Sequence, residues 1–290
     1  MTQGVMETPE RAPVKKGAAG RGVMRRGLAT PSARIGLAIV GLLYLAGLAA
    51  PLLTGYDPEA QSAHALLKAG GGHLLGTDEF GRDIFSRVLY GIRTDVLVTL
   101  VAVPIGAVTG TALGVLCGAH RVVDLVLQRF FDVALAFTAL ILGVTVAAIA
   151  GPGTTAVLIT VAGVNVPLFG RIARDAVMTE RDRDYAVAAT IAGVGPGRLL
   201  LRHILPNGLD ALIVQAALSL SLAVFVEGAM SFVGIGVRPP APSLGSLLRS
   251  SASFLNANPA YAIGPMIAVT LLVVGFNLVA DGLGKGLLRR

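Results

Sequence analysis

Long apolar stretches alternate with short polar segments along the 290-residue chain. A helix needs about 20 mostly apolar residues to cross the hydrocarbon core of a bilayer. The pattern therefore predicts an all-α, polytopic membrane protein with six transmembrane helices. Their predicted bounds are Ile35–Leu53, Val96–Gly118, Val133–Ala150, Thr155–Gly170, Ala211–Phe232 and Tyr261–Ala280. The turn 151–153, Gly-Pro-Gly, separates the third span from the fourth, so these two are expected to form a helical hairpin.

The segments between the spans carry an uneven distribution of positive charge. If the N-terminus is inside, 18 of the 24 Lys and Arg residues fall in inner segments and the others fall in outer segments. Cytoplasmic loops of membrane proteins hold an excess of Lys and Arg. The split therefore predicts that both termini are cytoplasmic.

The chain divides into three parts. Residues 1–30 are rich in Gly, Ala and basic residues, which predicts a disordered cytoplasmic tail. Residues 31–95 hold the first span and a long outer loop, in which apolar residues recur at helical spacing from Ile84 to Ile92. This spacing predicts a short amphipathic helix that lies at the outer interface and leads into the second span. Residues 96–290 hold the other five spans, as a helical core with a polar cytoplasmic loop at 171–207.

Composition supports the membrane assignment. Hydrophobic residues make up 54% of the chain and charged residues 14%, with a mean hydropathy of +0.74, whereas about a quarter of a soluble domain is charged. The net charge of +7 is divided among clusters separated by apolar runs. Such clusters are typical of membrane orientation. We therefore expect contact with membrane lipid and no binding of nucleic acid.

The sequence offers no constellation of residues for catalysis. The four histidines are scattered, and none belongs to an H-E-x-x-H pair. Neither a G-x-S-x-G elbow nor a phosphate-binding loop is present. The single cysteine, Cys117, lies inside an apolar run. We expect no catalytic residue, metal site or cofactor, so energy for any work must come from another subunit or an ion gradient.

Glycine recurs at every fourth position of the second span, at Gly106, Gly110, Gly114 and Gly118. This spacing places a smooth groove on one face of the helix. Another helix can approach closely along such a groove.

Two polar residues within the spans are candidates for a translocation pathway. Glu227 lies toward the outer end of the fifth span, and Asn165 interrupts the fourth. An ionised side chain at membrane depth costs about 3 kcal/mol unless it faces protein or water. Glu227 therefore either lines a pathway or pairs with a partner inside the protein. A chain of carboxylates and histidines at the midplane is missing, which disfavours a proton-coupled carrier.

The inner loop contains the stretch DYAVAATIAGVGPGRLLLRHILPN, residues 184–207. It predicts a first short helix with Asp182 or Asp184 in its opening turn and Gly193 at its end. A second helix is predicted to begin at Pro196 and to end at Pro206. The first helix is rich in alanine, so its surface is shallow and suits docking into a groove on a partner. Spacing alone does not decide between a helix that docks on a partner and a loop that packs on itself.

This loop resembles the "EAA" loop of bacterial ABC importer permeases, whose pattern is E-A-A-x3-G-x9-I-x-L-P. Ala188, Ala189, Gly193 and Pro206 match the pattern, as does the leucine before the proline, while Val187 stands in place of the glutamate. Further stretches extend the resemblance from Pro31 onward to the permeases of dipeptide, oligopeptide and nickel transporters, and more narrowly to their C-type subunit. These stretches include HLLGTDEFGRDIFSRVLYGIR, RFFDVALAF, VEGAMSFVGIGVRPPAPSLG and FNLVADGL.

The resemblance implies the type I importer permease fold, in the bacterial cytoplasmic (inner) membrane. It implies a heterodimer with a B-type permease, two ATPase subunits that bind the ATP, and an extracytoplasmic substrate-binding protein. The residues it implies for coupling to the ATPase are Asp184, Tyr185, Ala188, Ala189, Gly193, Pro196 and Pro206. The outer-loop motif that it marks is Gly76, Thr77, Asp78, Gly81, Arg82 and Asp83.

The leading hypothesis is therefore the permease subunit of an ATP-driven importer of dipeptides or oligopeptides. The same architecture could import nickel or another small solute. A stand-alone secondary carrier would need midplane charges or paired broken helices, and the sequence shows neither. A membrane-embedded enzyme is disfavoured because no acid, base or metal ligands cluster.

Overall fold

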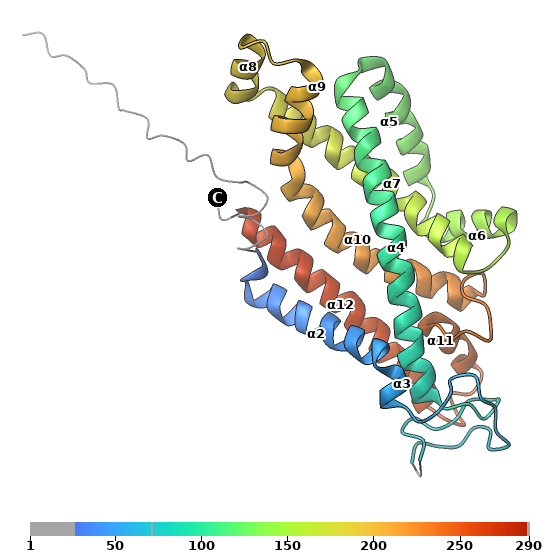
Figure 1. Cartoon of the computed structure of the whole chain (residues 1–290). Coiled ribbons are helices and arrows are strands. Elements are labelled where there is room, and N and C mark those ends of the chain that lie inside the picture. The colour runs from blue at the N-terminus through green and yellow to red at the C-terminus, as the bar shows by residue number, and fades with distance from the viewer. Residues whose placement is uncertain (1–26, 71, 289–290) are drawn as a thin grey trace, which may run out of the picture.

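The computed structural model describes residues 27–70 and 72–288, so most of the predicted tail lies outside the described part. Within these residues the chain is built from helices, which confirms the all-α prediction. Five helices are long and apolar enough to span a bilayer, or up to six if one bent pair counts as a span. The five are Pro31–Leu48 (α2), Ile84–Ala119 (α4), Thr154–Arg181 (α7), Leu205–Val233 (α10) and Ala260–Leu288 (α12) (Figure 1).

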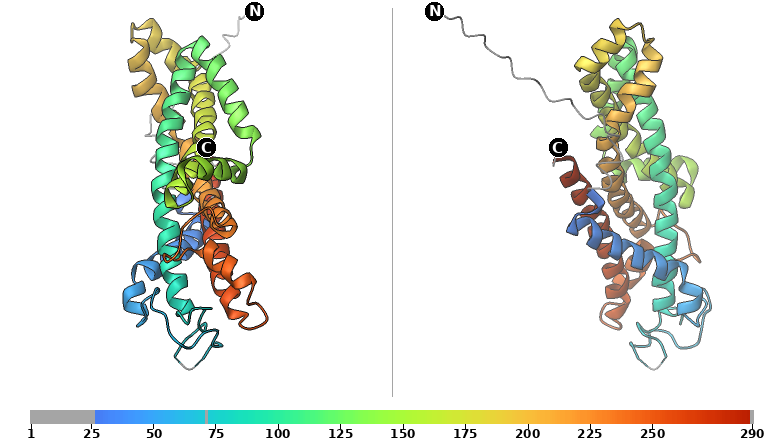
Figure 2. Two further views of the ribbon diagram at one scale, coloured as in Figure 1. Left: turned by 90° about the vertical axis from the view of Figure 1, so that its right-hand side faces the viewer. Right: turned by 60° about the vertical axis from the view of Figure 1, so that its left-hand side comes forward.

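The long helices connect two groups of loops, which define two ends of the molecule. The α8 end, named after the short helix Asp184–Ile191 (α8), holds the turn after α4 and the loop between α7 and α10 (Figure 1). The α11 end holds the segments 54–83 and 234–259, the second of which contains the helix Leu244–Ala252 (α11). The first residues of α2 lie beside the last turns of α12, far from the segment 54–83 (Figure 2).

The glycine stripe of α4 packs directly on α7. A Cβ atom added to Gly106 would lie 2.6 Å from the carbonyl oxygen of Ala162, and additions at Gly110, Gly114 and Gly118 would also collide with α7. The two backbones therefore approach more closely than a larger side chain permits. The predicted close helix contact along this face is confirmed.

Small residues also bring α2 and α12 together. A Cβ atom on Gly36 would lie 2.9 Å from the Cβ atom of Leu278. α2 begins at a cap formed by Thr30, whose hydroxyl accepts a hydrogen bond from the backbone N–H of Ala33. It ends at Leu48, and a separate turn of helix, Ala50–Leu53 (α3), completes the span predicted as one helix.

The third predicted span, Val133–Ala150, is broken rather than straight. Arg121–Ala136 (α5) and Ala139–Ala150 (α6) meet at a bend of 95°. Thr138 starts α6 because its hydroxyl accepts a hydrogen bond from the N–H of Ile141. α6 has 12 residues, about 18 Å at 1.5 Å per residue, which is too short to cross about 30 Å of hydrocarbon. The first arm of the predicted hairpin is therefore a bent pair of helices and not one straight spanning helix.

The segment from Ile84 to Ile92, predicted as an interfacial helix that leads into the second span, forms the first turns of α4. Asp83 caps this helix, and its carboxylate accepts a hydrogen bond from the N–H of Ser86 at 2.7 Å. Both isoleucines are buried in a core shared with residues of α2, α11 and α12. The apolar face that we assign from sequence to the membrane interface is used for packing within the protein.

The outer-loop motif folds into a compact set of hydrogen bonds at the α11 end. Its members are Gly76, Thr77, Asp78, Gly81, Arg82 and Asp83. The Thr77 hydroxyl donates to the carbonyl of His64 at 2.6 Å and accepts from the N–H of Leu67 at 2.9 Å. Arg82 donates from Nε to Asp78 at 2.6 Å. Both glycines have positive φ angles, 81° and 71°, which glycine adopts without strain. The described contacts of the motif stabilise the loop itself.

Candidate functional site

The loop between α7 and α10 contains two short helices and a π turn. These are Asp184–Ile191 (α8), Pro196–Leu199 (α9) and Leu200–Ile204 (η1). Gly193 has a φ angle of +80° and separates α8 from α9. Asp184 lies in the first turn of α8. The predicted first helix and its glycine stop are confirmed.

The second short helix does not end at Pro206. α9, η1 and α10 follow one another without a break, and Pro206 lies in the first turn of α10. Proline fits a first turn because the N–H groups there have no partner within the helix. The predicted stop at this proline is therefore wrong, and α10 begins at Leu205 rather than at Ala211.

Two of the alanines of α8 face inward. Ala186 is 1% exposed and belongs to a small core with Val177 of α7 and Leu199 of α9. Ala189 is half-buried against the same core. The sequence cannot distinguish these alanines from exposed ones, because all have the same residue type. The inward face explains why the loop keeps a defined shape.

The outward face of α8 is small and apolar. Ala188 is exposed, Val187 is 48% exposed and Ile191 is 82% exposed. Asp184 and Pro196 are exposed beside them. An apolar face of this kind on a short helix has the form of the element that enters a groove on a partner.

Polar contacts hold α8 to the end of α7, and the end of α7 to the end of α4. The Tyr185 hydroxyl donates to the carboxylate of Glu180 at 2.6 Å, and Arg183 pairs with the same carboxylate at 3.1 Å. Arg181 reaches the carbonyl oxygen of Gly118, the last glycine of the α4 stripe, at 3.5 Å. These contacts connect the start of α8 to the end of α7, and the end of α7 to the end of α4.

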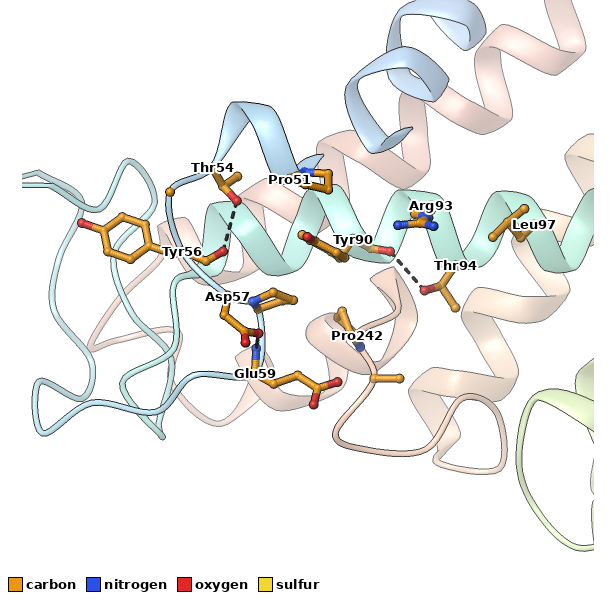
Figure 3. Close-up of a pocket in the computed structure, with 13 residues that line it drawn as sticks. Pro51, Thr54, Tyr56, Asp57, Glu59, Tyr90, Arg93, Thr94, Leu97 and Pro242 are labelled. Atoms are coloured by element: carbon orange, nitrogen blue, oxygen red, sulfur yellow. Dashed lines mark hydrogen bonds between the residues drawn. The ribbon is translucent and has the colours of Figure 1, made fainter. Parts of the chain in front are cut away.

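A hollow of about 730 Å³ opens at the α11 end (Figure 3). Tyr90, Arg93 and Leu97 of α4 form one wall, and the segment after α3 contributes Asp57 and Glu59 on the facing side (Figure 3). The hollow therefore presents carboxylates and a guanidinium together. None of these three charged side chains has an ion-pair partner within the described residues.

The two candidates for a pathway lie inside the protein. Glu227 is 0% exposed, and its Oε1 atom accepts a hydrogen bond from the hydroxyl of Ser231 at 2.7 Å. Asn165 is 1% exposed, and its amide donates to the carbonyl of Val161 at 2.7 Å. Neither side chain lines an opening in this conformation. For Glu227 the structure favours pairing inside the protein.

Sequence reasoning misses the partner of Glu227. This is Asp95 of α4, which is also 0% exposed and lies within hydrogen-bonding reach of Glu227. The sequence places Asp95 at the edge of a predicted span, close to Arg93 of the outer loop, where an acidic residue is ordinary. One signal was available: both acidic residues fall at the outer ends of their spans.

The fold and the two loop ends together define a class, an integral membrane transport subunit made of packed helices. Residues 110–290 match the family model described as the inner membrane component of binding-protein-dependent transport systems. Residues 20–69 match the N-terminal transmembrane domain of oligopeptide transport permease C. The chain belongs to this family of ABC transporter permeases.

Curated relatives resemble most of the chain. The dipeptide transport system permease protein DppC of Alkalihalophilus pseudofirmus is 38% identical over 87% of this chain and 84% of its own length. The di/tripeptide permease DppC of Pseudomonas aeruginosa is 39% identical over 87% and 86%. The glutathione transport system permease GsiD of Pectobacterium atrosepticum is 34% identical over 82% and 80%.

A solved structure resembles the chain in its fold. An inward-facing structure of the MetNI methionine ABC transporter aligns with a TM-score of 0.55 at 20% identity, over 67% of this chain and 93% of its own. The importer permease fold is therefore confirmed.

Proposed function

We propose that the chain is the membrane-spanning subunit through which an ATP-driven importer moves peptides into the cell. The subunit itself binds no ATP; two partner ATPases bind and hydrolyse it. A second, B-type permease completes the pathway, and an extracytoplasmic binding protein delivers the peptide. The relatives named for dipeptide, di/tripeptide and glutathione transport support this choice of cargo.

The observation that carries the proposal is the outward apolar face of α8. Val187, Ala188 and Ile191 are exposed on a helix that is anchored from behind by Glu180. An anchored helix transmits force, whereas a mobile loop does not. We assign this face to the groove of an ATPase, with Gly193 and Pro196 forming the bend that sets the angle between α8 and α9.

The hollow at the α11 end is the surface that we assign to delivery. Its carboxylates at Asp57 and Glu59 and the guanidinium of Arg93 suit the charged surface of a binding protein. This assignment places the α11 end outside the cell and the α8 end in the cytoplasm. Both termini are then cytoplasmic, and the membrane is the bacterial inner membrane.

The docking face is tested by Ala188→Arg, measured in the reconstituted importer. A long charged side chain there should reduce peptide uptake about tenfold or more, equivalent to about 1.4 kcal/mol of lost docking free energy. The control is Ala65→Arg, an equally exposed alanine of the outer loop. The assignment is wrong if both variants retain normal uptake and normal ATPase activity.

A second candidate function is the import of nickel or another small solute by the same architecture. The broad set of peptide-related names among the relatives favours peptides. Uptake of labelled dipeptide and of nickel by the same reconstituted complex, with its binding protein, decides between them. Transport by the isolated chain with no ATPase present would instead indicate a secondary carrier.

A further inference from the structure

A pair of acidic side chains is buried where three helices meet at the α11 end. Asp95 comes from α4 and Glu227 from α10, and both are 0% exposed. Their carboxyl groups lie within hydrogen-bonding reach of each other. The backbone N–H of Leu244, the first residue of α11, donates to Oδ2 of Asp95 at 3.2 Å.

Each carboxyl has one oxygen with a partner and one without. Oδ2 of Asp95 accepts from Leu244, and Oε1 of Glu227 accepts from the Ser231 hydroxyl at 2.7 Å. Within the described residues, Oδ1 of Asp95 and Oε2 of Glu227 are buried and form no hydrogen bond. Because buried polar atoms in folded proteins are nearly always hydrogen-bonded, two such oxygens on adjacent groups need an explanation.

Ser231 cannot supply a hydrogen bond to either of these two oxygens. Its hydroxyl proton is directed to Glu227, and its oxygen accepts from the N–H of Val237 at 3.0 Å. The Ser243 hydroxyl lies within reach of Glu227 and accepts from the N–H of Ser246 at 3.2 Å, so it keeps one proton of its own, which can serve at most one of the two oxygens.

Positive charge is also missing from the neighbourhood. Neither carboxyl forms an ion pair within the described residues, so no cation from α4, α10 or α11 balances the pair. Two ionised carboxylates in contact, away from water, would repel each other strongly and each would remain desolvated. A single proton between the two removes one charge and gives both unpartnered oxygens a hydrogen bond.

We propose that Asp95 and Glu227 bind one proton between Oδ1 and Oε2, and that this shared-proton pair fastens α11 to α4 and α10. One carboxyl donates the O–H and the other accepts it as the carboxylate, so the pair carries one negative charge. The remaining carboxylate oxygens then accept from Leu244 and Ser231, which connects all three helices. The pair is separate from the α8 face and does not depend on the identity of the cargo.

The close fit of α11 supports this role. A Cβ atom added to Gly245 would lie 2.8 Å from the Cβ atom of Ser231 and would also collide with the backbone of Gly228. α11 therefore sits directly on the turn of α10 that carries Glu227. Two ionised carboxylates at this position would repel each other and would separate α11 from α10, which are in close contact here.

Infrared spectroscopy of the complete importer in lipid nanodiscs tests the proton directly. At neutral pH the native complex should show the C=O stretching band of a neutral carboxylic acid. The band should disappear in Glu227→Gln and also in Asp95→Asn, because either change removes one half of the pair. Asp124→Asn, which alters an ion-paired carboxylate, should leave the band in place.

Stability measurements in the same complex separate a shared proton from ordinary packing. A side-chain amide donates an N–H in the place of the acidic O–H, so Glu227→Gln and Asp95→Asn should keep the melting temperature within a few degrees. Glu227→Ala and Asp95→Ala should lower it clearly, because each leaves a buried carboxylate alone. The proposal is overturned if the native complex lacks the carboxylic acid band, or if the amide variants melt as early as the alanine variants.

Discussion

Gly110 and Gly114 show how much a single missing side chain decides in this protein. Each turns a bare α-carbon toward α7, where the carbonyl oxygens of Val166 and Gly170 occupy the place of a Cβ atom. Gly163 of α7 differs, since a Cβ atom there meets nothing within 4 Å. Residue type is the same in all three cases, and only the environment separates them.

This difference leads to a prediction about Gly110→Ala. The added methyl group would force α4 away from α7, at a cost of about 1–3 kcal/mol for an overpacked core. Gly163→Ala should be neutral or slightly stabilising, because alanine suits a helix interior better than glycine. Thermal unfolding of the two variants in detergent, followed by size-exclusion chromatography, measures the contrast. Equal melting temperatures would show that the glycine stripe is not a tight contact.

At the scale of elements, α5 is held to α7 by charge. Arg174 donates from Nη2 to Oδ2 of Asp124 at 2.8 Å and also pairs through Nε with the second carboxylate oxygen. The two side chains are 25% and 14% exposed. Such a bidentate, partly buried ion pair is stronger than an exposed ion pair.

We predict that Arg174→Gln loosens α5 and lowers the free energy of unfolding by about 1.5–3 kcal/mol, the range for hydrogen bonds to charged groups. Arg174→Asp combined with Asp124→Arg should recover part of the loss. The exposed pair between Lys285 and Asp281 is the control, since an i,i+4 surface pair contributes about 0.3–0.5 kcal/mol. A double-mutant cycle from unfolding curves gives both coupling energies. A coupling for the α5–α7 pair no larger than for the control would contradict the prediction.

Hydropathy predicts which segments become long helices, because burial in lipid demands long apolar runs. It fails where an apolar run crosses a structural break. The run through Phe137 and Thr138 stays apolar, yet the threonine hydroxyl caps a new helix there. It also fails at Ile84–Ile92, because the amphipathic pattern of an interfacial helix equals that of a helix packed on α11 and α12.

In the candidate site, too, the sequence predicts some features and misses others. The sequence predicts α8 and its glycine stop from local signals, and both are local features. It does not predict which alanines face inward, nor the contact between Asp95 and Glu227, because these depend on packing between segments distant in the chain. Contacts of that kind are fixed by tertiary structure alone.

At the scale of the whole molecule, the two ends are proposed to face opposite sides of the membrane. The single cysteine makes a direct test possible, since Cys117 is 2% exposed and can be replaced by alanine. In that background Ala65→Cys marks the α11 end and Gly197→Cys marks the α8 end, and both positions are exposed.

We predict that a membrane-impermeant maleimide labels Ala65→Cys in intact spheroplasts and leaves Gly197→Cys unlabelled. In inside-out vesicles the labelling should be reversed. Denaturing the membrane first should expose both cysteines, which controls for reactivity. Labelling of Gly197→Cys in intact spheroplasts would place α8 outside the cell and contradict the proposed docking to an ATPase.

The unbroken run from α9 through η1 into α10 has a mechanical consequence. Pro206 lies at one end of this helix and Glu227 near the other, about 32 Å apart at 1.5 Å per residue. A helix of that length behaves as a rod, so a small tilt imposed at its first turn appears enlarged where it meets α11. The acidic pair lies toward the end of α10 that is farther from α8, so we expect a movement that begins at one membrane face to change the contact between Asp95 and Glu227 at the other.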